Sequence, residues 1–127
     1  METQLTGFID DLKKQVQSNP NLKNYDEAAT KQGIILPILH HLDWNAFDVN
    51  EVYPEYNLDG KKVDYPLRTG DVNRVFVEAK RTGEDLDNHQ EQLLTYSFKE
   101  GVELAILTNG ITWWFYLPLK KGNWEQR

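Results

Sequence analysis

The order of predicted elements in the second half of the chain constrains the fold most. A strand-like run, RVFVEAK (74–80), is followed by a helical segment at 85–99 and by a second strand-like run, VELAILT (102–108). This order favours two parallel neighbouring strands joined by a right-handed crossover. Asn109-Gly110 then precedes ITWWFYL (111–117), which predicts a hairpin with a two-residue type I′ turn. We therefore expect an α/β fold with a mixed β-sheet flanked by α-helices.

The first half of the chain predicts helices followed by strands. Apolar spacing indicates a helix at 3–18 and another at 26–42, which Pro37 should kink near Gly33. The segments FDVNEVYPEYNL (47–58) and KKVDYPL (61–67) read as two strands that form a meander with RVFVEAK. We expect one domain over residues 1–127. The chain ends without a closing element after Leu119, which leaves the alternative that it is the N-terminal part of a longer protein.

Composition narrows the class of protein. The chain has no cysteine, and no apolar run is long enough to cross a membrane, so we expect a cytoplasmic protein without a membrane partner. The net charge of −6 argues against a protein that holds nucleic acid by charge alone. It is compatible with a nucleic-acid enzyme, because divalent cations reverse the local charge of an acidic active site.

Two carboxylates are predicted to face each other on a hairpin. If the turn between KKVDYPL and RVFVEAK is centred on Asp71, residues equally distant from it are paired, and Asp64 lies opposite Glu78. Strand alternation places Lys80 on the same face, while Val63, Val75, Val77 and Ala79 share the apolar face. A slip of one residue would separate the two acids.

Opposed carboxylates destabilise a hairpin unless something compensates their charge. In one interpretation, Lys80 or Arg74 pairs with the acids on a solvated face. In the other, the two carboxylates hold a hard divalent cation such as Mg²⁺ or Mn²⁺. The residues themselves leave both interpretations open.

The arrangement resembles a known signature. An acid, a hairpin loop and then Glu-X-Lys on the next strand is similar to the motif of PD-(D/E)XK nucleases, with Asp64 as the first acid and Glu78-Ala79-Lys80 as the rest. Val63 stands where that motif has its proline. Gln92 and Tyr96 reproduce a Gln-X-X-X-Tyr pattern that a subset of these nucleases carries on the following helix.

The resemblance extends over most of the chain, from about Glu27 to Trp124. DEAATKQGIILPILHHLDW resembles an early helix that carries an acid, here Glu27, and LAILTNGITWWFY resembles the hairpin after the motif. Together these segments are similar to the N-terminal nuclease domain of type I restriction enzyme R subunits. The resemblance implies a restriction-endonuclease-like mixed sheet and an Mg²⁺-dependent endonuclease that cleaves DNA. Targeting would come from other domains or from motor, specificity or methylation subunits of a restriction system.

The resemblance also implies roles for individual residues. Asp64, Glu78 and the backbone carbonyl of Ala79 would bind the metal, and Lys80 would orient the attacking water or neutralise charge on the phosphate. Glu27 would ligate the ion through water or help to position it. Gln92 would contact the metal shell or the DNA backbone, and Tyr96 would brace the site or touch a phosphate.

Simpler interpretations exist for some of these residues. Tyr96 fits a core aromatic residue, and Glu27 fits a first-turn acid favoured by the helix dipole. The alternative function is a catalytically inactive nucleic-acid-binding or assembly module with the same fold.

Overall fold

The computed structural model describes residues 2–18, 20–58 and 61–120. Its helices are α1 (Glu2–Ser18), α2 (Glu27–Thr30), α3 (Leu36–His41) and α4 (Gln90–Lys99), with 3₁₀ turns at Pro20–Asn24 and Leu86–Asn88 and a π-helical segment at Lys31–Ile35. Its strands are β1 (Tyr56–Leu58), β2 (Lys61–Val63), β3 (Tyr65–Thr69), β4 (Val72–Ala79), β5 (Leu104–Thr108) and β6 (Trp113–Tyr116). None of the helices in the described ranges combines the length and apolar composition that crossing a bilayer requires.

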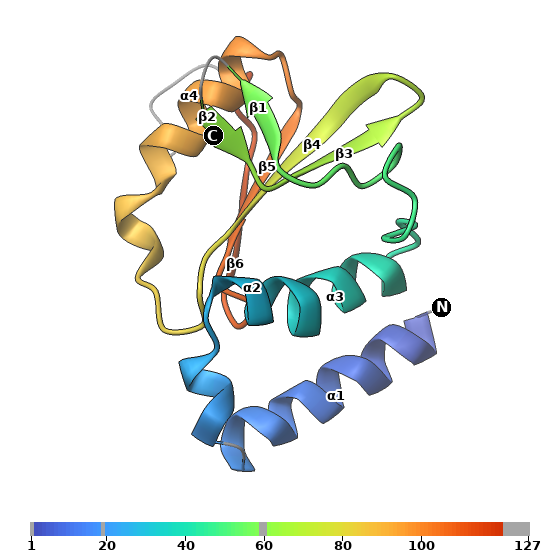
Figure 1. The fold of residues 1–127 in the computed structure, drawn as a ribbon, viewed down its shortest axis with the longest axis vertical. Helices are drawn as coiled ribbons and strands as arrows, with labels where there is room; N and C mark the ends of the chain where they lie inside the picture. The colour runs from blue at the N-terminus through green and yellow to red at the C-terminus, as the bar shows by residue number, and fades with distance from the viewer. Residues whose placement is uncertain (1, 19, 59–60, 121–127) are drawn as a thin grey trace.

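Four strands form a mixed sheet in the order β3-β4-β5-β6, and β1 pairs with β2 separately (Figure 1). β4 and β5 are parallel, as the strand, helix and strand order predicted, and the other neighbouring pairs are antiparallel. Helix α4 packs on one face of the sheet and α3 on the other, while α1 packs against α3. The expected α/β class is confirmed.

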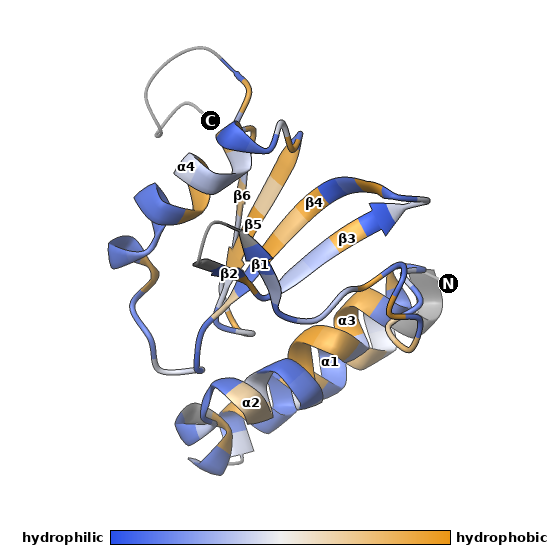
Figure 2. Cartoon of the chain, turned by 45° about the horizontal axis from the view of Figure 1, so that its top comes forward, coloured by the Kyte–Doolittle hydropathy of each residue, from blue (hydrophilic) through white to orange (hydrophobic). Residues whose placement is uncertain are grey.

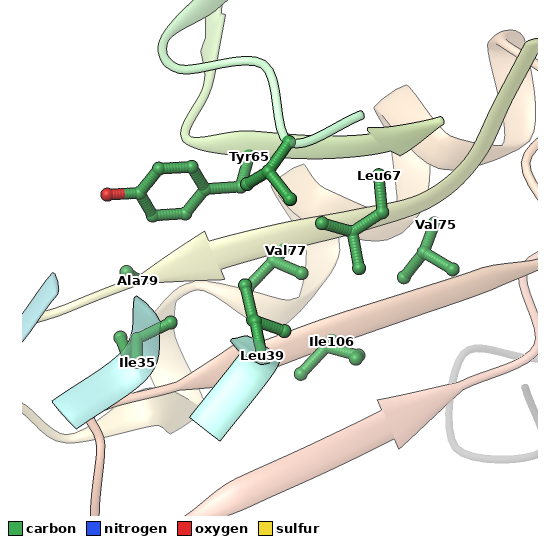
Figure 3. Packing of buried hydrophobic residues seen from close by; sticks show 9 residues of the cluster. Ile35, Leu39, Tyr65, Leu67, Val75, Val77, Ala79 and Ile106 are labelled. Carbon is green, nitrogen blue, oxygen red and sulfur yellow. The ribbon is translucent and has the colours of Figure 1, made fainter. Parts of the chain in front are cut away.

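The two faces of β4 bury different side chains. Val75, Val77 and Ala79 face the α3 side, where Figure 3 shows Val77 and Ile106 of the sheet near Leu39 of α3. Phe76 faces α4 and packs in the other cluster with residues of α4 and β5. Figure 2 shows hydrophobic residues concentrated on the central strands and on α3. Glu78, two residues after Phe76, therefore lies on the α4 side of the sheet.

Val63 corrects the predicted face assignment. It packs with Phe76 on the α4 side rather than with Val75, Val77 and Ala79. The predicted strand KKVDYPL is also split, because the chain bends at Asp64. Its first part, β2, pairs with β1, and its second part, β3, pairs with β4. Strand alternation therefore does not continue from Val63 across the bend.

Asp64 lies beside Glu78, as predicted, but the turn of the β3–β4 hairpin is not centred where we assumed. The turn residues are Gly70 and Asp71, so the turn is centred half a residue earlier than we assumed, and Thr69 pairs with Val72. A β-bulge then adds Arg74 to β4, because Leu67 pairs with Val75 while Arg68 pairs with Asn73. Beyond the bulge, Tyr65 pairs with Val77 as the last pair of the ladder, and Asp64, at the bend just before it, meets the side chain of Glu78.

Most of the predicted strand at 47–58 is wrong. Only Tyr56–Leu58 forms a strand, and residues 47–55 form turns with an isolated bridge between Val52 and Leu67. Asp48 supplies part of the reason, since its carboxylate accepts a hydrogen bond from the Asn50 N–H and stabilises a turn. Pro54 has no N–H for a ladder, and Glu55 has a positive φ of 55°.

The hairpin after β5 is confirmed, but its turn is longer than the predicted two residues. Thr108 pairs with Trp113, which leaves a four-residue loop from Asn109 to Thr112. The Asn109 side chain accepts hydrogen bonds from the N–H groups of Ile111 and Thr112. Only Gly110 takes a positive φ, 88°, whereas a type I′ turn needs two such residues.

The predicted helix at 26–42 contains a π-helical segment at Lys31–Ile35, where we expected a kink. Pro37 lacks an N–H and its ring crowds the carbonyl of Gly33, so an ordinary α-helical register is unfavourable there. Widening of the turn accommodates the proline. The segment begins at Lys31, whose side chain reaches the acids described below.

Candidate active site

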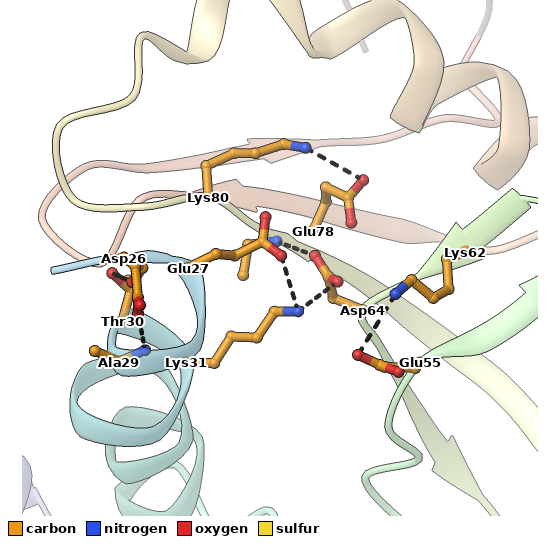
Figure 4. Close-up of polar contacts among 11 residues, drawn as sticks. Asp26, Glu27, Ala29, Thr30, Lys31, Glu55, Lys62, Asp64, Glu78 and Lys80 are labelled. Carbon is orange, nitrogen blue, oxygen red and sulfur yellow. Dashed lines mark hydrogen bonds and ion pairs between the residues drawn. The ribbon is translucent and has the colours of Figure 1, made fainter.

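Asp64 is held by groups from two other elements. It lies at the bend between β2 and β3, and its side chain is only 7% exposed. Oδ2 accepts a hydrogen bond of 2.8 Å from the backbone N–H of Ala79. Oδ1 accepts one of 2.7 Å from Lys31 Nζ (Figure 4). The carboxylate thus joins β4 to the helical layer and has a fixed orientation.

Glu78 and Lys80 come from the end of β4. The side chain of Glu78 is 15% exposed and forms a hydrogen bond with Asp64, so the structure brings the two predicted acids together. Lys80 follows β4 and is anchored through its N–H, which donates to the Thr108 carbonyl at 2.8 Å. Lys80 Nζ lies 4.0 Å from Glu78 Oε2, too far for a hydrogen bond.

The acids differ in the protonation state that their surroundings favour. Burial, together with the hydrogen bond to Asp64 and its charge, raises the pKa of Glu78 to about 9. Burial also acts to raise the pKa of Asp64, but hydrogen bonds from Glu78, Lys31 and the Ala79 N–H outweigh it and hold that pKa below its ordinary value. At neutral pH, Glu78 is therefore protonated and donates to an ionised Asp64.

The helical layer adds an ion pair, Glu27 with Lys31, to the site that Asp64, Glu78 and Lys80 form. Glu27 is the first residue of α2, after the N-cap Asp26, and its carboxylate lies 3.3 Å from Lys31 Nζ. The charge of Glu27 also contributes to raising the pKa of Glu78. Lys31 is 13% exposed and bridges Glu27 and Asp64. Glu27 is thus both a first-turn residue and a member of the acidic cluster.

Lys31 is the residue that the sequence pattern did not single out. The sequence does contain a pattern that could have pointed to Lys31: Glu27 and Lys31 are four positions apart, so they share a helix face and can form an ion pair. That spacing is common on solvated helices, and only the fold shows that this face meets the sheet at Asp64.

Gln92 and Tyr96 lie on α4, the helix that packs on the Phe76 face of the sheet, which is also the face of Glu78. Gln92 Nε2 donates a hydrogen bond of 2.5 Å to the hydroxyl of Tyr96, so the predicted shared helix face is confirmed. Tyr96 is buried and Gln92 is exposed. Their direct roles toward the acids stay predictions.

Lys31→Met should destabilise the protein at pH 7 by about 3 kcal/mol, because it removes the cation beside a buried carboxylate. Lys62→Met is the matched control, since Lys62 pairs with Glu55 at 3.5 Å on an exposed surface, where the cost should stay within about 0.5 kcal/mol. Urea unfolding at pH 7 measures both values. Equal losses in the two variants would show that Lys31 does not stabilise the acidic cluster.

Comparison with protein-family models, with curated proteins and with solved structures found no match for this chain.

Proposed function

We propose that this chain is an Mg²⁺-dependent endonuclease domain of the PD-(D/E)XK type with a restriction-endonuclease-like fold. Its substrate would be DNA, and other domains or subunits of a restriction system would supply targeting. The observation that carries the proposal is the pairing of the buried Asp64 carboxylate with the half-buried Glu78, with Lys80 just after β4 and Lys31 from the helical layer.

The donor set fits a hard divalent cation. Mg²⁺ prefers oxygen ligands and commonly uses one or two carboxylates together with water and substrate phosphate. Among the described residues, no group of three or more His, Cys, Asp or Glu side chains is placed to hold a metal. Asp64, Glu78 and the carbonyl of Ala79 would therefore bind it with help from water and DNA. A bound cation would also take over the roles of the proton on Glu78 and of the Lys31 ammonium group, which now offset the negative charge of the two carboxylates.

The chain's own residues would divide the work of phosphodiester hydrolysis. The bound metal would supply Lewis acidity toward the phosphate and toward water. The hydrogen bond from the Ala79 N–H fixes Asp64, so that this carboxylate is already oriented. Lys80, tethered through its backbone to β5, would orient the attacking water or neutralise charge developing on the phosphate. Glu27 would help to position the ion.

Gln92 and Tyr96 would act from α4. Their mutual hydrogen bond restricts both side chains, which suits Gln92 to contact the metal shell or the DNA backbone while Tyr96 braces it. The alternative, an inactive binding or assembly module with the same fold, would require no metal and would cleave nothing.

Nicking of supercoiled plasmid tests the proposal. Wild-type protein with Mg²⁺ should nick the plasmid, and Lys80→Ala should slow nicking by about 10²-fold, because one electrostatic contact to the transition state is lost. Lys99→Ala is the control, since Lys99 is exposed at the end of α4. Nicking that persists unchanged in Lys80→Ala would remove Lys80 from the mechanism. Absence of nicking by the wild type would favour the inactive module.

A further inference from the structure

On the surface of the β3–β4 hairpin, Arg68 lies in the corner formed by two tyrosine rings, Tyr53 and Tyr56, which meet at right angles with their centres 5.9 Å apart. Its guanidinium carbon lies 4.8 Å from the ring centre of Tyr53 and 4.9 Å from that of Tyr56. Its Nε donates a hydrogen bond of 2.7 Å to Asn73 Oδ1. Tyr53 is 38% exposed, and Arg68 is half-buried. We call these four residues the Arg68 clamp. It fixes the plane of a guanidinium near solvent, which is the form in which arginine recognises phosphate.

The clamp shares a strand and a face with the proposed active site. The bulge residue, Arg74, lies in β4, so β3 keeps its regular alternation. Tyr65 and Leu67 point to the α3 side, and Pro66 and Arg68 therefore lie on the opposite side, the side of Glu78. Arg68 lies four positions after Asp64, a span of about 13 Å along an extended chain.

The segment that carries the two tyrosines, from the loop at Tyr53 to the start of β1 at Tyr56, is also tied to Asp64. The N–H of Tyr53 donates to the Pro66 carbonyl at 3.2 Å, and the N–H of Glu55 donates to the Asp64 carbonyl at 2.8 Å. The Arg68 clamp and the first acid thus belong to one hydrogen-bonded unit. A strand of nucleic acid held by the clamp would have a defined position relative to the acids.

Arg68 keeps its charge available. Among the ion pairs of the described residues, none includes Arg68. Two acids line the same surface pocket as Arg68 without an ion pair to it: the carboxylate of Asp48 accepts a hydrogen bond from the Asn50 N–H, and that of Glu51 accepts one from the Asn45 N–H. In a chain with a net charge of −6, a pre-oriented arginine of this kind offers local attraction for a phosphate that the whole molecule lacks.

We infer that the Arg68 clamp binds a backbone phosphate of DNA and sets the position of the strand relative to Asp64 and Glu78. This inference rests on the proposed function. Arg68 acts as a positioning residue, about 13 Å along the chain from Asp64. The tyrosine rings restrict the guanidinium, so that little side-chain freedom is lost on binding.

The test compares Arg68→Gln with Arg74→Gln. Each variant loses one positive charge from the same hairpin, and Arg74 is the matched control because its Nε donates to Thr69 Oγ1 instead of to the clamp. The probe is a DNA duplex of about 12 base pairs, titrated to about 1 mM into ¹⁵N-labelled protein in EDTA and followed by NMR. Arg68→Gln should bind about tenfold more weakly than the wild type, and Arg74→Gln should differ little from it.

Salt dependence separates a phosphate contact from indirect effects. Between about 50 and 200 mM NaCl, the affinity of Arg68→Gln should fall about 3.5-fold less than that of the wild type, as expected for one phosphate contact fewer. In the wild type, the Arg68 Nε–H signal should shift with saturation during the titration. Arg68→Lys, which keeps the charge but not the planar fork, should bind between the wild type and Arg68→Gln.

Two results would overturn the inference. One is equal weakening by Arg68→Gln and Arg74→Gln, and the other is no shift of the Arg68 signal at the highest duplex concentration. Thermal unfolding of each variant shows whether it is folded. Because EDTA removes the metal and the reaction, failure of this test leaves plasmid nicking as a separate test of the proposed function.

Discussion

Replacing Glu78 by Gln should make the metal-free protein more stable than the wild type at pH 9, while the two differ little near pH 5. In the wild type, burial and Asp64 raise the pKa of Glu78 from 4.5 to about 9 in the folded state. Between these two values the folded protein holds a proton that the unfolded chain has released. The free energy of unfolding therefore falls as the pH rises, by up to about 1.4 kcal/mol for each pH unit.

Glutamine imitates the protonated acid, since its amide can donate to Asp64 as the protonated carboxyl does. Glu78→Gln should therefore lose this pH dependence, and the gap between the variants should reach on the order of 5 kcal/mol by pH 9. Asp64 contributes with the opposite sign, because its pKa is lowered. The stability that it adds is lost only as the pH falls below about 4, outside this range.

Urea unfolding in EDTA at pH 5, 7 and 9 measures the effect. Glu55→Gln is the control, because Glu55 is an exposed acid on the same surface, paired with Lys62. Its stability should follow that of the wild type at each pH. Parallel curves for the wild type and Glu78→Gln would show that Glu78 does not hold a proton in the folded protein.

The pairing of Asp64 with Glu78 shows how much the sequence could predict. Turn residues and strand alternation were enough to propose that the two acids meet, and the structure brings them together. The assumed turn centre was half a residue late, and a bulge at Arg74 compensates for the difference. Because a bulge leaves no clear mark in a single sequence, the residues alone could suggest this register but could not establish it.

The surroundings of the acids were harder to predict, because they depend on contacts between distant segments. Lys31 reaches Asp64 across 33 positions of sequence. Strand propensity failed at 47–55, where hydrogen bonds from turn backbone to Asp48 compete with strand pairing. Val63 moved to the other face because a bend at Asp64 interrupts the alternation. In each of these three cases, the structure depends on a contact or a change in chain direction that the pattern of neighbouring residues does not reveal.

Asp64→Ala should remove metal binding and with it DNA cleavage. The variant keeps Glu78 as the one fully placed carboxylate, whereas Mg²⁺ or Mn²⁺ held by one or two carboxylates depends strongly on each of them. We expect the affinity for Mn²⁺ to fall by at least about 10²-fold. Plasmid nicking should fall by about 10³-fold, which corresponds to several kcal/mol of lost transition-state stabilisation.

Calorimetric titration with Mn²⁺ at pH 7 tests the existence of the metal site most directly. The wild type should bind one Mn²⁺ per chain, and titration in two buffers of different ionisation enthalpy should show release of close to one proton, from Glu78. Glu55→Gln should bind like the wild type, and Asp64→Ala should give no binding heat. Absence of Mn²⁺ binding by the wild type, or equal binding by Asp64→Ala, would contradict the assignment of Asp64 and Glu78 as the centre of a metal-dependent nuclease.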